Sequence, residues 1–388
     1  MQEKLALAAL SAGPGAARMR AWRLHAYGAA RDLRLEAARV PALRAPRDVL
    51  VRVRAASLNP IDVAMLAGYG ARALNVLRAL DGAPAGPEFP LVPGRDFVGV
   101  VARAGPASRL RPGQRVWGVL PPHRQGCHAD FVVVKDEWTG PAPAALSDAE
   151  AAGALYAALT ACAALRAAGL DAAAATRAPR VLLLGLGGVG QAALQLLAAR
   201  GAHVVVGAAP ALAALGARLG AAAVLDRHAP DYERRLEDAG PYDAVLDCAG
   251  LGGDEAAARR WRFSRYVTLT SPLLRTMEAR GVAAGAACAA ATLLAQNARA
   301  AAAPGSLPSP GSLPPQVRWA FFSPSAADIE HLRRLAERGQ FTVCVEHVFP
   351  WWSGAEAYER AQRGGARGKL VLDFTAEGGG SEGSVSSS

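Results

Sequence analysis

Paired cysteines, long apolar runs and lysine clusters are all lacking in this sequence. The five cysteines are scattered, and no two of them form a C-x-x-C pair. This spacing argues against a secreted disulfide framework and against a structural zinc site, and it favours reduced intracellular thiols. The chain has no run of about 18 strongly apolar residues, and the alanine-rich run at 281–295 is too short and too weakly apolar for a bilayer. We therefore expect no transmembrane segment.

A concentrated basic surface is also missing, although the formal net charge is +10. Only three of the 43 basic residues are lysines, and the arginines are spread along the chain without interleaved aromatic residues. This distribution does not predict a nucleic-acid partner. With 52% hydrophobic and 20% charged residues, the composition is that of a globular protein, and 388 residues allow two domains.

Three segments look unlike folded sequence. Residues 1–18 form a short leader that is basic and poor in acids, which fits either a transit peptide or an unstructured tail. The low-complexity stretch at 298–316 predicts a loop. The Gly/Ser/Glu-rich residues 375–388 predict a disordered tail because they have nothing to bury.

Residues 19–146 read as short strands separated by proline and glycine. Apolar and polar residues alternate at 49–54, and short apolar runs follow at 97–102, 115–119 and 131–134. Short strands at this spacing predict a β-barrel-like domain.

The periodicity changes at Ser147, where Ser147 and Glu150 form a capping box that predicts the start of a helix. A strand at 180–185, a glycine turn, a helix to residue 200 and an apolar run at 203–206 then have the length of a β-α-β unit. Further buried strands are predicted at 222–225, 243–247 and 266–270. Strands that alternate with helices predict a parallel, doubly wound α/β sheet. A helix at 325–339 and a strand at 369–374 follow.

The glycine turn fits the pattern G-x-G-x-x-G between a strand and a helix. Gly185 permits the tight turn, Gly187 lets the backbone approach a pyrophosphate, and Gly190 lets the helix pack closely on the strand. The helix N-terminus offers unpaired N–H groups and a partial positive charge. We therefore predict a nicotinamide dinucleotide site here in preference to a turn without a ligand.

The residues after the second strand favour NADPH as the cofactor. An NAD site usually places Asp or Glu about 20 residues after the first glycine, but the segment 205–211 contains no acid. The missing carboxylate removes a group that would repel a 2′-phosphate. The nearest cations are Arg218 and Arg227, each of which could instead be a solvated surface residue.

Several motifs together resemble the medium-chain dehydrogenase/reductase superfamily, on its zinc-independent quinone-reductase side. Besides the glycine turn they are Ser57-Leu-Asn-Pro-Ile-Asp62, Gly68-Tyr-Gly70, Phe89-Pro-Leu-Val-Pro-Gly-Arg-Asp96, Tyr156-Ala-Ala-Leu-Thr-Ala161, Arg318-Trp-Ala-Phe-Phe322 and Ala366-Arg-Gly-Lys369. The resemblance runs from about Met19 to Phe374. Within the superfamily, the sequence most resembles a mitochondrial branch that is linked to reticulon-type membrane proteins.

This resemblance implies an α/β protein with two domains. A GroES-like β-barrel catalytic domain would span 19–146 and be completed by about 325–374, and a Rossmann NAD(P)-binding domain would span 147–324. The resemblance also implies NADPH-dependent reduction of a small-molecule quinone, a mitochondrial location in the matrix or at the outer membrane, and a link to ubiquinone biosynthesis. A reticulon-type membrane protein is the implied partner, and the oligomeric state stays open.

A catalytic zinc is not expected. Zinc-bearing members of the superfamily have a cysteine at or near the position of Asn59, and Gly-His-Glu where this chain has Gly94-Arg95-Asp96. Because a catalytic zinc needs three such ligands, we expect no metal.

Without a metal, the pocket must orient the substrate and stabilise a developing oxyanion with hydrogen-bond donors. Asn59, an amide donor, and Tyr69, a phenol donor, are the catalytic candidates, with a simple turn and a structural aromatic as the alternatives. Asp62 fits a structural role better. Tyr156 and Thr160 could face the nicotinamide or lie in the core.

The resemblance also assigns cofactor contacts. These fall on the turn residues Gly187, Gly188 and Val189, on Leu269, and on Arg367, Gly368 and Lys369. Arg227 could supply charge at the 2′-phosphate. Relatives tend to have Ser at Ala209, Tyr at Arg227 and Asn at Cys248, and the hydroxyl lost at Ala209 is one that would favour NADPH.

Two other functions fit the same sequence. One is a metal-free 2-enoyl-thioester reductase, for which Tyr69 would be the proton donor. The other is a cofactor-binding protein that acts through reticulon-type partners with little turnover.

Overall fold

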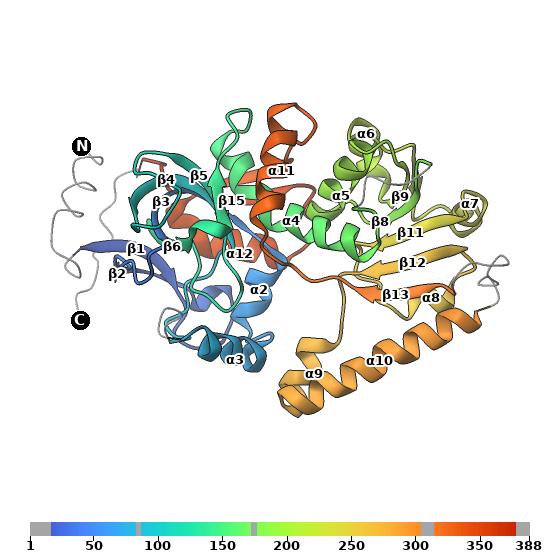
Figure 1. Ribbon diagram of the computed structural model, residues 1–388, viewed down its shortest axis with the longest axis horizontal. Helices are drawn as coiled ribbons and strands as arrows, with labels where there is room; N and C mark the ends of the chain where they lie inside the picture. The colour runs from blue at the N-terminus through green and yellow to red at the C-terminus, as the bar shows by residue number, and fades with distance from the viewer. Residues whose placement is uncertain (1–16, 83–86, 172–176, 304–313, 378–388) are drawn as a thin grey trace. The chain divides into compact units, whose positions relative to one another are not determined.

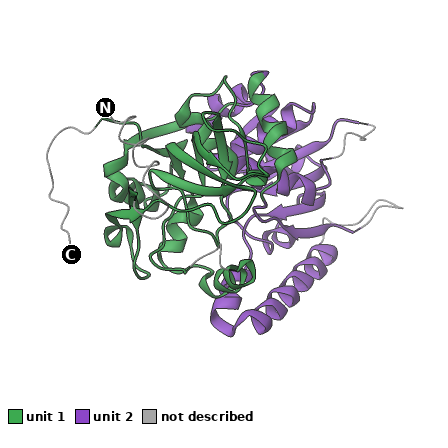
Figure 2. Ribbon diagram, turned by 60° about the vertical axis from the view of Figure 1, so that its left-hand side comes forward, with its two compact units in different colours: residues 1–156, 324–337, 342–388 green, residues 157–323, 338–341 purple. Residues whose placement is uncertain are grey.

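The computed structural model describes residues 17–82, 87–171, 177–303 and 314–377 (Figure 1). The chain divides into two compact units (Figure 2). Unit 1 takes in the chain up to Tyr156, Pro324–Glu337 and the chain from Thr342, and unit 2 takes in Ala157–Ser323 and Arg338–Phe341. None of the described helices combines the length and the apolar character that a membrane span requires.

Unit 1 is built around a seven-stranded, mostly antiparallel sheet. Its strands follow the order β14-β15-β3-β4-β5-β7, and β6 also pairs with β3. They are β3 (Asp48–Leu58), β4 (Asp96–Ala104), β5 (Arg115–Val119), β6 (Phe131–Lys135), β7 (Thr139–Pro141), β14 (Val345–Pro350) and β15 (Lys369–Asp373). A separate antiparallel ribbon joins β1 (Arg18–Arg23) to β2 (Arg34–Arg39). The last strand, β15, pairs antiparallel with β3, so Leu370 lies opposite Leu58.

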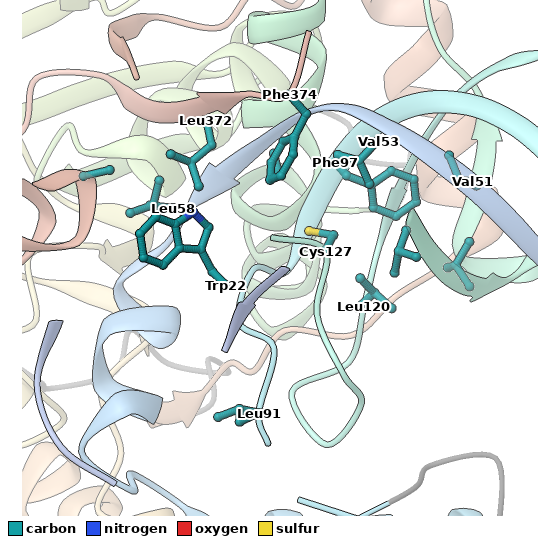
Figure 3. Packing of buried hydrophobic residues seen from close by; sticks show 14 of the residues in the cluster. Trp22, Val51, Val53, Leu58, Leu91, Phe97, Leu120, Cys127, Leu372 and Phe374 are labelled. Atoms are coloured by element: carbon teal, nitrogen blue, oxygen red, sulfur yellow. The ribbon is translucent and has the colours of Figure 1, made fainter. Parts of the chain in front are cut away.

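The core of unit 1 forms because the strands carry buried aliphatic and aromatic residues. Trp22, Val51, Phe97 and Leu372 belong to one continuous cluster (Figure 3). The helices of this unit are α2 (Pro60–Leu66), α3 (Ala71–Asp81), α11 (Ala326–Glu337), α12 (Gly354–Gln362) and the first part of α4 (Asp148–Ala167). Burial of such side chains is the main favourable contribution to the stability of a domain.

Unit 2 is a parallel sheet of six strands in the order β10-β9-β8-β11-β12-β13. In chain order this is 3-2-1-4-5-6, the arrangement of dinucleotide-binding folds. The strands are β8 (Arg180–Leu184), β9 (His203–Ala208), β10 (Ala223–Asp226), β11 (Tyr242–Asp247), β12 (Phe263–Thr268) and β13 (Gln316–Trp319). The helices are α5 (Gly188–Ala198), α6 (Ala213–Arg218), α7 (Tyr232–Asp238), α8 (Glu255–Ala258), α9 (Leu273–Arg280) and α10 (Val282–Ala302).

The fold class predicted from the sequence is confirmed, but several boundaries differ. The boundary between the units lies after Tyr156, inside α4, and not before Ser147. The start of α4 stays with unit 1 because the Asp148 carboxylate accepts hydrogen bonds from Arg54 and Arg115. The short segment 338–341 was expected to belong to the C-terminal part of the barrel domain (325–374), but it lies in unit 2.

Two segments expected to lack structure are partly regular. Helix α10 continues to Ala302, into the expected loop at 298–316, because its end is rich in alanine, the best helix former. Strand β1 begins at Arg18, inside the expected leader. Residues 1–16, 304–313 and 378–388 of the expected leader, loop and tail lie outside the described residues.

Candidate active site

The end of β3 and the start of α2 place the first candidate residues. Asn59 is the N-cap of α2, Pro60 occupies the first turn, and the backbone N–H of Asn59 donates to the Asp62 carboxylate at 2.9 Å. Proline is favoured there because the first helical N–H groups have no partner inside the helix. The turn expected at Asn59-Pro60 is therefore a helix cap.

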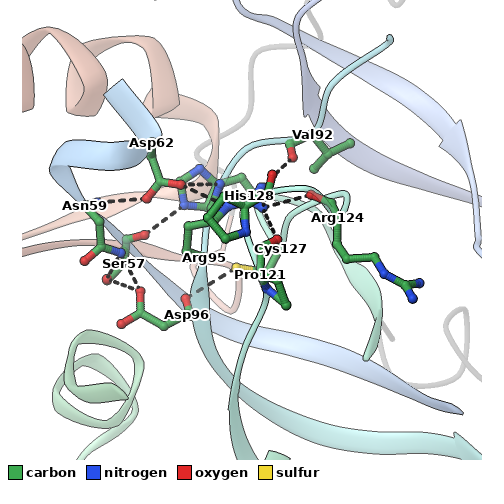
Figure 4. Close-up of polar contacts among 12 residues, drawn as sticks. Ser57, Asn59, Asp62, Val92, Arg95, Asp96, Pro121, Arg124, Cys127 and His128 are labelled. Atoms are coloured by element: carbon green, nitrogen blue, oxygen red, sulfur yellow. Dashed lines mark hydrogen bonds and ion pairs between the residues drawn. The ribbon is translucent and has the colours of Figure 1, made fainter. Parts of the chain in front are cut away.

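Asp96, the first residue of β4, is the acceptor at the centre of this region (Figure 4). It is fully buried, and its Oδ1 accepts from Ser57 Oγ at 2.5 Å and from Asn59 Nδ2 at 2.8 Å. Its Oδ2 accepts from the backbone N–H of Tyr156 at 3.0 Å. A buried carboxylate with this many donors holds each donor in a fixed place.

The contact with Asp96 decides which way the Asn59 amide points. An ionised carboxylate only accepts hydrogen bonds, so the amide nitrogen faces Asp96 and the amide oxygen faces away from it. That oxygen accepts from Lys369 Nζ at 2.6 Å. The amide nitrogen that was expected to donate to a substrate carbonyl is thus committed to Asp96, and the ammonium of Lys369 is the donor beside it.

Lys369 is the first residue of β15 and is 8% exposed. Its aliphatic stem packs against α4, where a Cβ built on Gly153 would lie 3.0 Å from its Cβ and Cγ. The ammonium can donate three hydrogen bonds, and Asn59 takes one of them. The resemblance assigned Lys369 to the cofactor, whereas the structure joins it to Asn59.

Asp62 forms a buried ion pair with Arg95. Both side chains are fully buried, and Arg95 Nε lies 3.3 Å from Asp62 Oδ1, which also accepts from the backbone N–H of Gly94 at 3.0 Å. Burial raises the pKa of Asp62, and the Arg95 guanidinium opposes that rise. Arg95 Nη1 donates to the backbone oxygens of Pro121 and Arg124. These contacts give Asp62 a structural role, as the sequence favoured.

The residues in the position of the superfamily's catalytic zinc do not fit a metal ion. Two cations, Arg95 and Lys369, already face the carboxylate and amide oxygens of this region. The described part of the chain contains no group of three His, Cys, Asp or Glu side chains that could bind a metal.

The phenol candidates occupy different settings. Tyr69 follows α2 and is half-buried, and its backbone N–H donates to Ala64 at 3.2 Å. Tyr156 lies in α4, where burial raises the pKa of its phenol and the nearby Asp62 carboxylate raises it further. Thr160 is buried in the part of α4 that belongs to unit 2. Thr160 is thus buried, whereas Tyr69 and Tyr156 are both half-buried.

His128, a residue not predicted from the sequence, supports the backbone beside this network. Its Nε2 lies 3.1 Å from the Ser57 carbonyl oxygen and its Nδ1 lies 3.1 Å from the Tyr358 hydroxyl. Because a carbonyl only accepts, Nε2 carries the proton and Nδ1 accepts from Tyr358. Burial lowers the pKa of His128 to about 4, and the charge of Arg95 contributes.

We expect the free energy of unfolding to fall by about 2 kcal/mol between pH 7 and pH 5 because of His128. The imidazole has its ordinary pKa of 6.5 in the unfolded chain, and folding lowers this pKa to about 4. The unfolded chain therefore binds more protons between these values, and stability rises with pH there. Urea unfolding at both pH values measures the loss. In a His128→Gln variant the pH dependence should be smaller by this amount, and an equal dependence would contradict the assignment.

The predicted dinucleotide turn lies between β8 and α5 of unit 2. Gly185 has φ +88°, and a Cβ on Gly190 would lie 2.1 Å from the Gly185 carbonyl oxygen, so the fold itself requires glycine at both positions. Gly187 is the N-cap of α5, and a Cβ there would meet nothing within 4 Å. Gly187 and Gly188 are exposed and Val189 is half-buried. Open space over unpaired helix N–H groups fits a pyrophosphate.

Asp247, another residue not singled out from the sequence, organises the neighbouring edge of the sheet. Its carboxylate accepts from the backbone N–H groups of 249–252 and from the Thr268 hydroxyl at 2.7 Å. Its backbone oxygen accepts from the N–H of Leu269, which follows β12. Leu269 thus lies at the carboxyl edge of the sheet, where ligands of such folds bind.

The other expected cofactor contacts are spread over both units. Arg227 follows β10, and its backbone N–H donates to Ala208, the last residue of β9, at 3.0 Å. Cys248, where relatives tend to have Asn, is half-buried, and desolvation raises the pKa of its thiol. In unit 1, Gly368 packs against Cys344, the residue before β14, and a Cβ on Gly368 would lie 2.6 Å from the Cys344 oxygen. The N–H of Arg367 donates to Glu346. Close packing therefore requires glycine at position 368, independently of any contact with the cofactor.

Comparisons with known proteins agree with this geometry. The family described as alcohol dehydrogenase GroES-like domain matches residues 45–144, and that described as zinc-binding dehydrogenase matches residues 219–372. A quinone oxidoreductase structure from Coxiella burnetii is 23% identical, covers 92% of this chain and 99% of its own, and has a TM-score of 0.70. At 23% identity this similarity supports the fold alone.

Curated relatives extend the similarity over almost the whole chain. Trans-enoyl reductase pgmF of Aspergillus terreus is 28% identical over 84% of this chain and 86% of its own length. The Drosophila melanogaster protein named "NAD(P)H oxidoreductase RTN4IP1, mitochondrial" is 37% identical over 93% of this chain and 88% of its own length. The chain therefore belongs to the mitochondrial NAD(P)H oxidoreductase RTN4IP1 family of the medium-chain dehydrogenase/reductase superfamily.

Proposed function

We propose that this protein is an NADPH-dependent reductase of quinones in mitochondria, linked to ubiquinone biosynthesis. The observation that carries the proposal is the buried ammonium of Lys369, which Asn59 and Asp96 hold in place beside a region unsuited to a metal. A fixed cation of this kind stabilises negative charge that develops on a carbonyl oxygen.

The residues of unit 1 would act through position and charge. Asp96 orients Asn59, Asn59 orients Lys369, and the ammonium has donors left for the oxygen of a bound carbonyl. The nicotinamide, when bound, supplies the hydride. A reduced quinone oxygen is a weak base, so solvent can complete its protonation and no strong acid is needed. Tyr69 is available as a second donor.

The cofactor would be held mainly by unit 2. Gly185, Gly187, Gly188, Val189 and Gly190 would receive the pyrophosphate at the N-terminus of α5, with Leu269 at the neighbouring strand end. Two features favour NADPH: the segment 205–211 contains no acid, and Arg227 lies beside the last residue of β9. The resemblance to the superfamily also assigns Arg367, Gly368 and Lys369 to the cofactor.

A second candidate function is reduction of a 2-enoyl thioester, which the similarity to a trans-enoyl reductase favours. That reaction delivers a proton to carbon, so it needs a positioned acid, and the half-buried phenol of Tyr69 is the candidate for that role.

Replacing Tyr69 by phenylalanine distinguishes the two reactions. For a quinone reductase we expect kcat to change by less than about threefold, whereas an enoyl reductase should lose about a hundredfold when its general acid is removed. The measurement is a kinetic comparison of a short-chain quinone with crotonyl thioester, using NADPH and then NADH, for wild type and variant. Faster turnover of the thioester, abolished in Tyr69→Phe, would reject the quinone proposal.

We place a reticulon-type membrane protein as the partner of this enzyme, because the resemblance is to a branch linked to such proteins. The alternative, a cofactor-binding partner protein with little turnover, would bind NADPH without oxidising it. Nicotinamide fluorescence should change when purified protein is mixed with NADPH, and the bound nucleotide should be oxidised when a short-chain quinone is added; binding without oxidation would favour the partner protein.

A further inference from the structure

Unit 1 contains a hollow that the reductase function does not use. It has a volume of about 530 Å³ and lies among the β1–β2 ribbon, the segment 41–44, β6 and the loops near Val92 and Gln125. Six charged residues line it: Arg18, Arg23, Arg39, Arg44, Arg124 and Asp48. The residues of the Asn59–Lys369 network are absent from its lining. The hollow is therefore a separate feature with a strong excess of positive charge.

Local partners balance only part of that charge. Arg23 pairs with Glu36 at 3.1 Å, and Arg124 pairs with Asp81. The Asp48 carboxylate is 5% exposed and accepts from the backbone N–H groups of Arg44 and Ala45. The hydrogen bonds of the Asp48 carboxylate are thus made within its own turn. Among the described residues, neither Arg18 nor Arg39 forms an ion pair.

The register of the ribbon brings these two arginines together. Arg18 lies directly opposite Arg39 at the end of the antiparallel pair, and both side chains are exposed. Like charges directly opposite each other destabilise a two-stranded ribbon. An anion bound between them would remove that repulsion and add charge-assisted hydrogen bonds.

The rest of the lining is largely apolar and includes Met19, Val92 and Phe131. An arginine pair beside apolar side chains fits a ligand that has both an anionic group and an apolar group. A small inorganic anion would leave the apolar part of the hollow unused, and a neutral lipid would leave the arginines unpaired.

We propose that this hollow binds a phosphorylated amphiphile, with the phosphate between Arg18 and Arg39 and the apolar group against Val92 and Phe131. The same chemistry occurs in a soluble phosphate ester and in the headgroup region of an anionic phospholipid. The proposal stands on the charge and register of unit 1 and does not depend on the reaction that the protein catalyses.

Calorimetric titration of the full chain with dihexanoyl phosphatidate tests the site. The protein is first saturated with NADPH, so that phosphate does not occupy the nucleotide site. We expect binding by wild type, about tenfold weaker binding by Arg39→Gln, and unchanged binding by Arg103→Gln, an exposed arginine of β4 outside the hollow. Equal affinity of both variants, or no binding by wild type, would overturn the proposal.

Two further arms identify the chemistry and its source. Dihexanoyl phosphatidylcholine should bind poorly because its phosphate charge is balanced, and equal binding of the two lipids would overturn the proposal. Co-sedimentation with phosphatidate-containing vesicles, lost in Arg39→Gln, identifies a membrane headgroup, whereas binding of the short lipid alone identifies a soluble ester. In phosphate-free buffer Arg39→Gln should melt at a higher temperature than wild type, since the variant lacks the repulsion from Arg18.

Discussion

A Lys369→Met variant should reduce quinone with a kcat lowered by roughly a hundredfold or more, while its Kd for NADPH stays within about threefold of wild type. Methionine keeps most of the stem that packs against Gly153 and removes the ammonium that Asn59 holds. The donor to the developing oxyanion is then lost, but the apolar packing is kept. Stopped-flow reduction and nicotinamide fluorescence measure the two quantities separately.

Two control variants separate a catalytic role of Lys369 from the cofactor contact that the resemblance implies. Asn59→Leu leaves the ammonium in the chain but removes its 2.6 Å acceptor, so we expect a smaller loss of kcat, about tenfold. Lys369→Arg keeps the charge with a different shape and should recover part of the activity. A weaker Kd for NADPH with an unchanged kcat in Lys369→Met would assign Lys369 to the cofactor instead.

The second large effect is expected from two matched substitutions in the glycine turn. Gly187→Ala should raise the Kd for NADPH at least about tenfold, because its Cβ enters the space that the pyrophosphate needs. It should leave the melting temperature almost unchanged, because that Cβ meets no protein atom within 4 Å. The backbone at Gly187 is extended with φ −73°, which alanine adopts without strain.

Gly190→Ala should behave differently. Its Cβ would lie 2.1 Å from the Gly185 carbonyl oxygen, so the turn must shift, and overpacking of this kind costs about 1–3 kcal/mol. Thermal unfolding without nucleotide should therefore distinguish the two variants, while NADPH titration shows weak binding by both. A stable Gly187→Ala variant with unchanged affinity would contradict a pyrophosphate at this turn.

The sequence predicted unit 2 well because its signals are local. Strands β8 and β9 are short apolar runs, and the glycine turn follows β8 directly. The sequence did not predict β13, in which two of the four residues, Gln316 and Arg318, are polar. The boundary inside α4 could not be read in the same way. It depends on contacts of Asp148 with Arg54 and Arg115, which are distant along the chain.

The candidate site could be predicted only in part for the same reason. The sequence indicates Asn59 for the substrate and Lys369 for the cofactor, because it does not show that residues 310 positions apart share a hydrogen bond. The orientation of the Asn59 amide follows from Asp96. An acid that begins an apolar strand was a signal that could have been used. For His128 the sequence offered no such signal, since its partners are a carbonyl oxygen and a distant tyrosine.

The pairing of β15 with β3 has a consequence for how the protein is made. Domains of a nascent chain generally fold in the order of their synthesis, and unit 2 is almost one continuous stretch that can fold as it leaves the ribosome. Unit 1 must wait for its last strand, which brings the ammonium to Asn59 only when residue 369 has been added. A prematurely terminated chain could therefore bind nucleotide, yet it would lack the group proposed to stabilise the reduced oxygen.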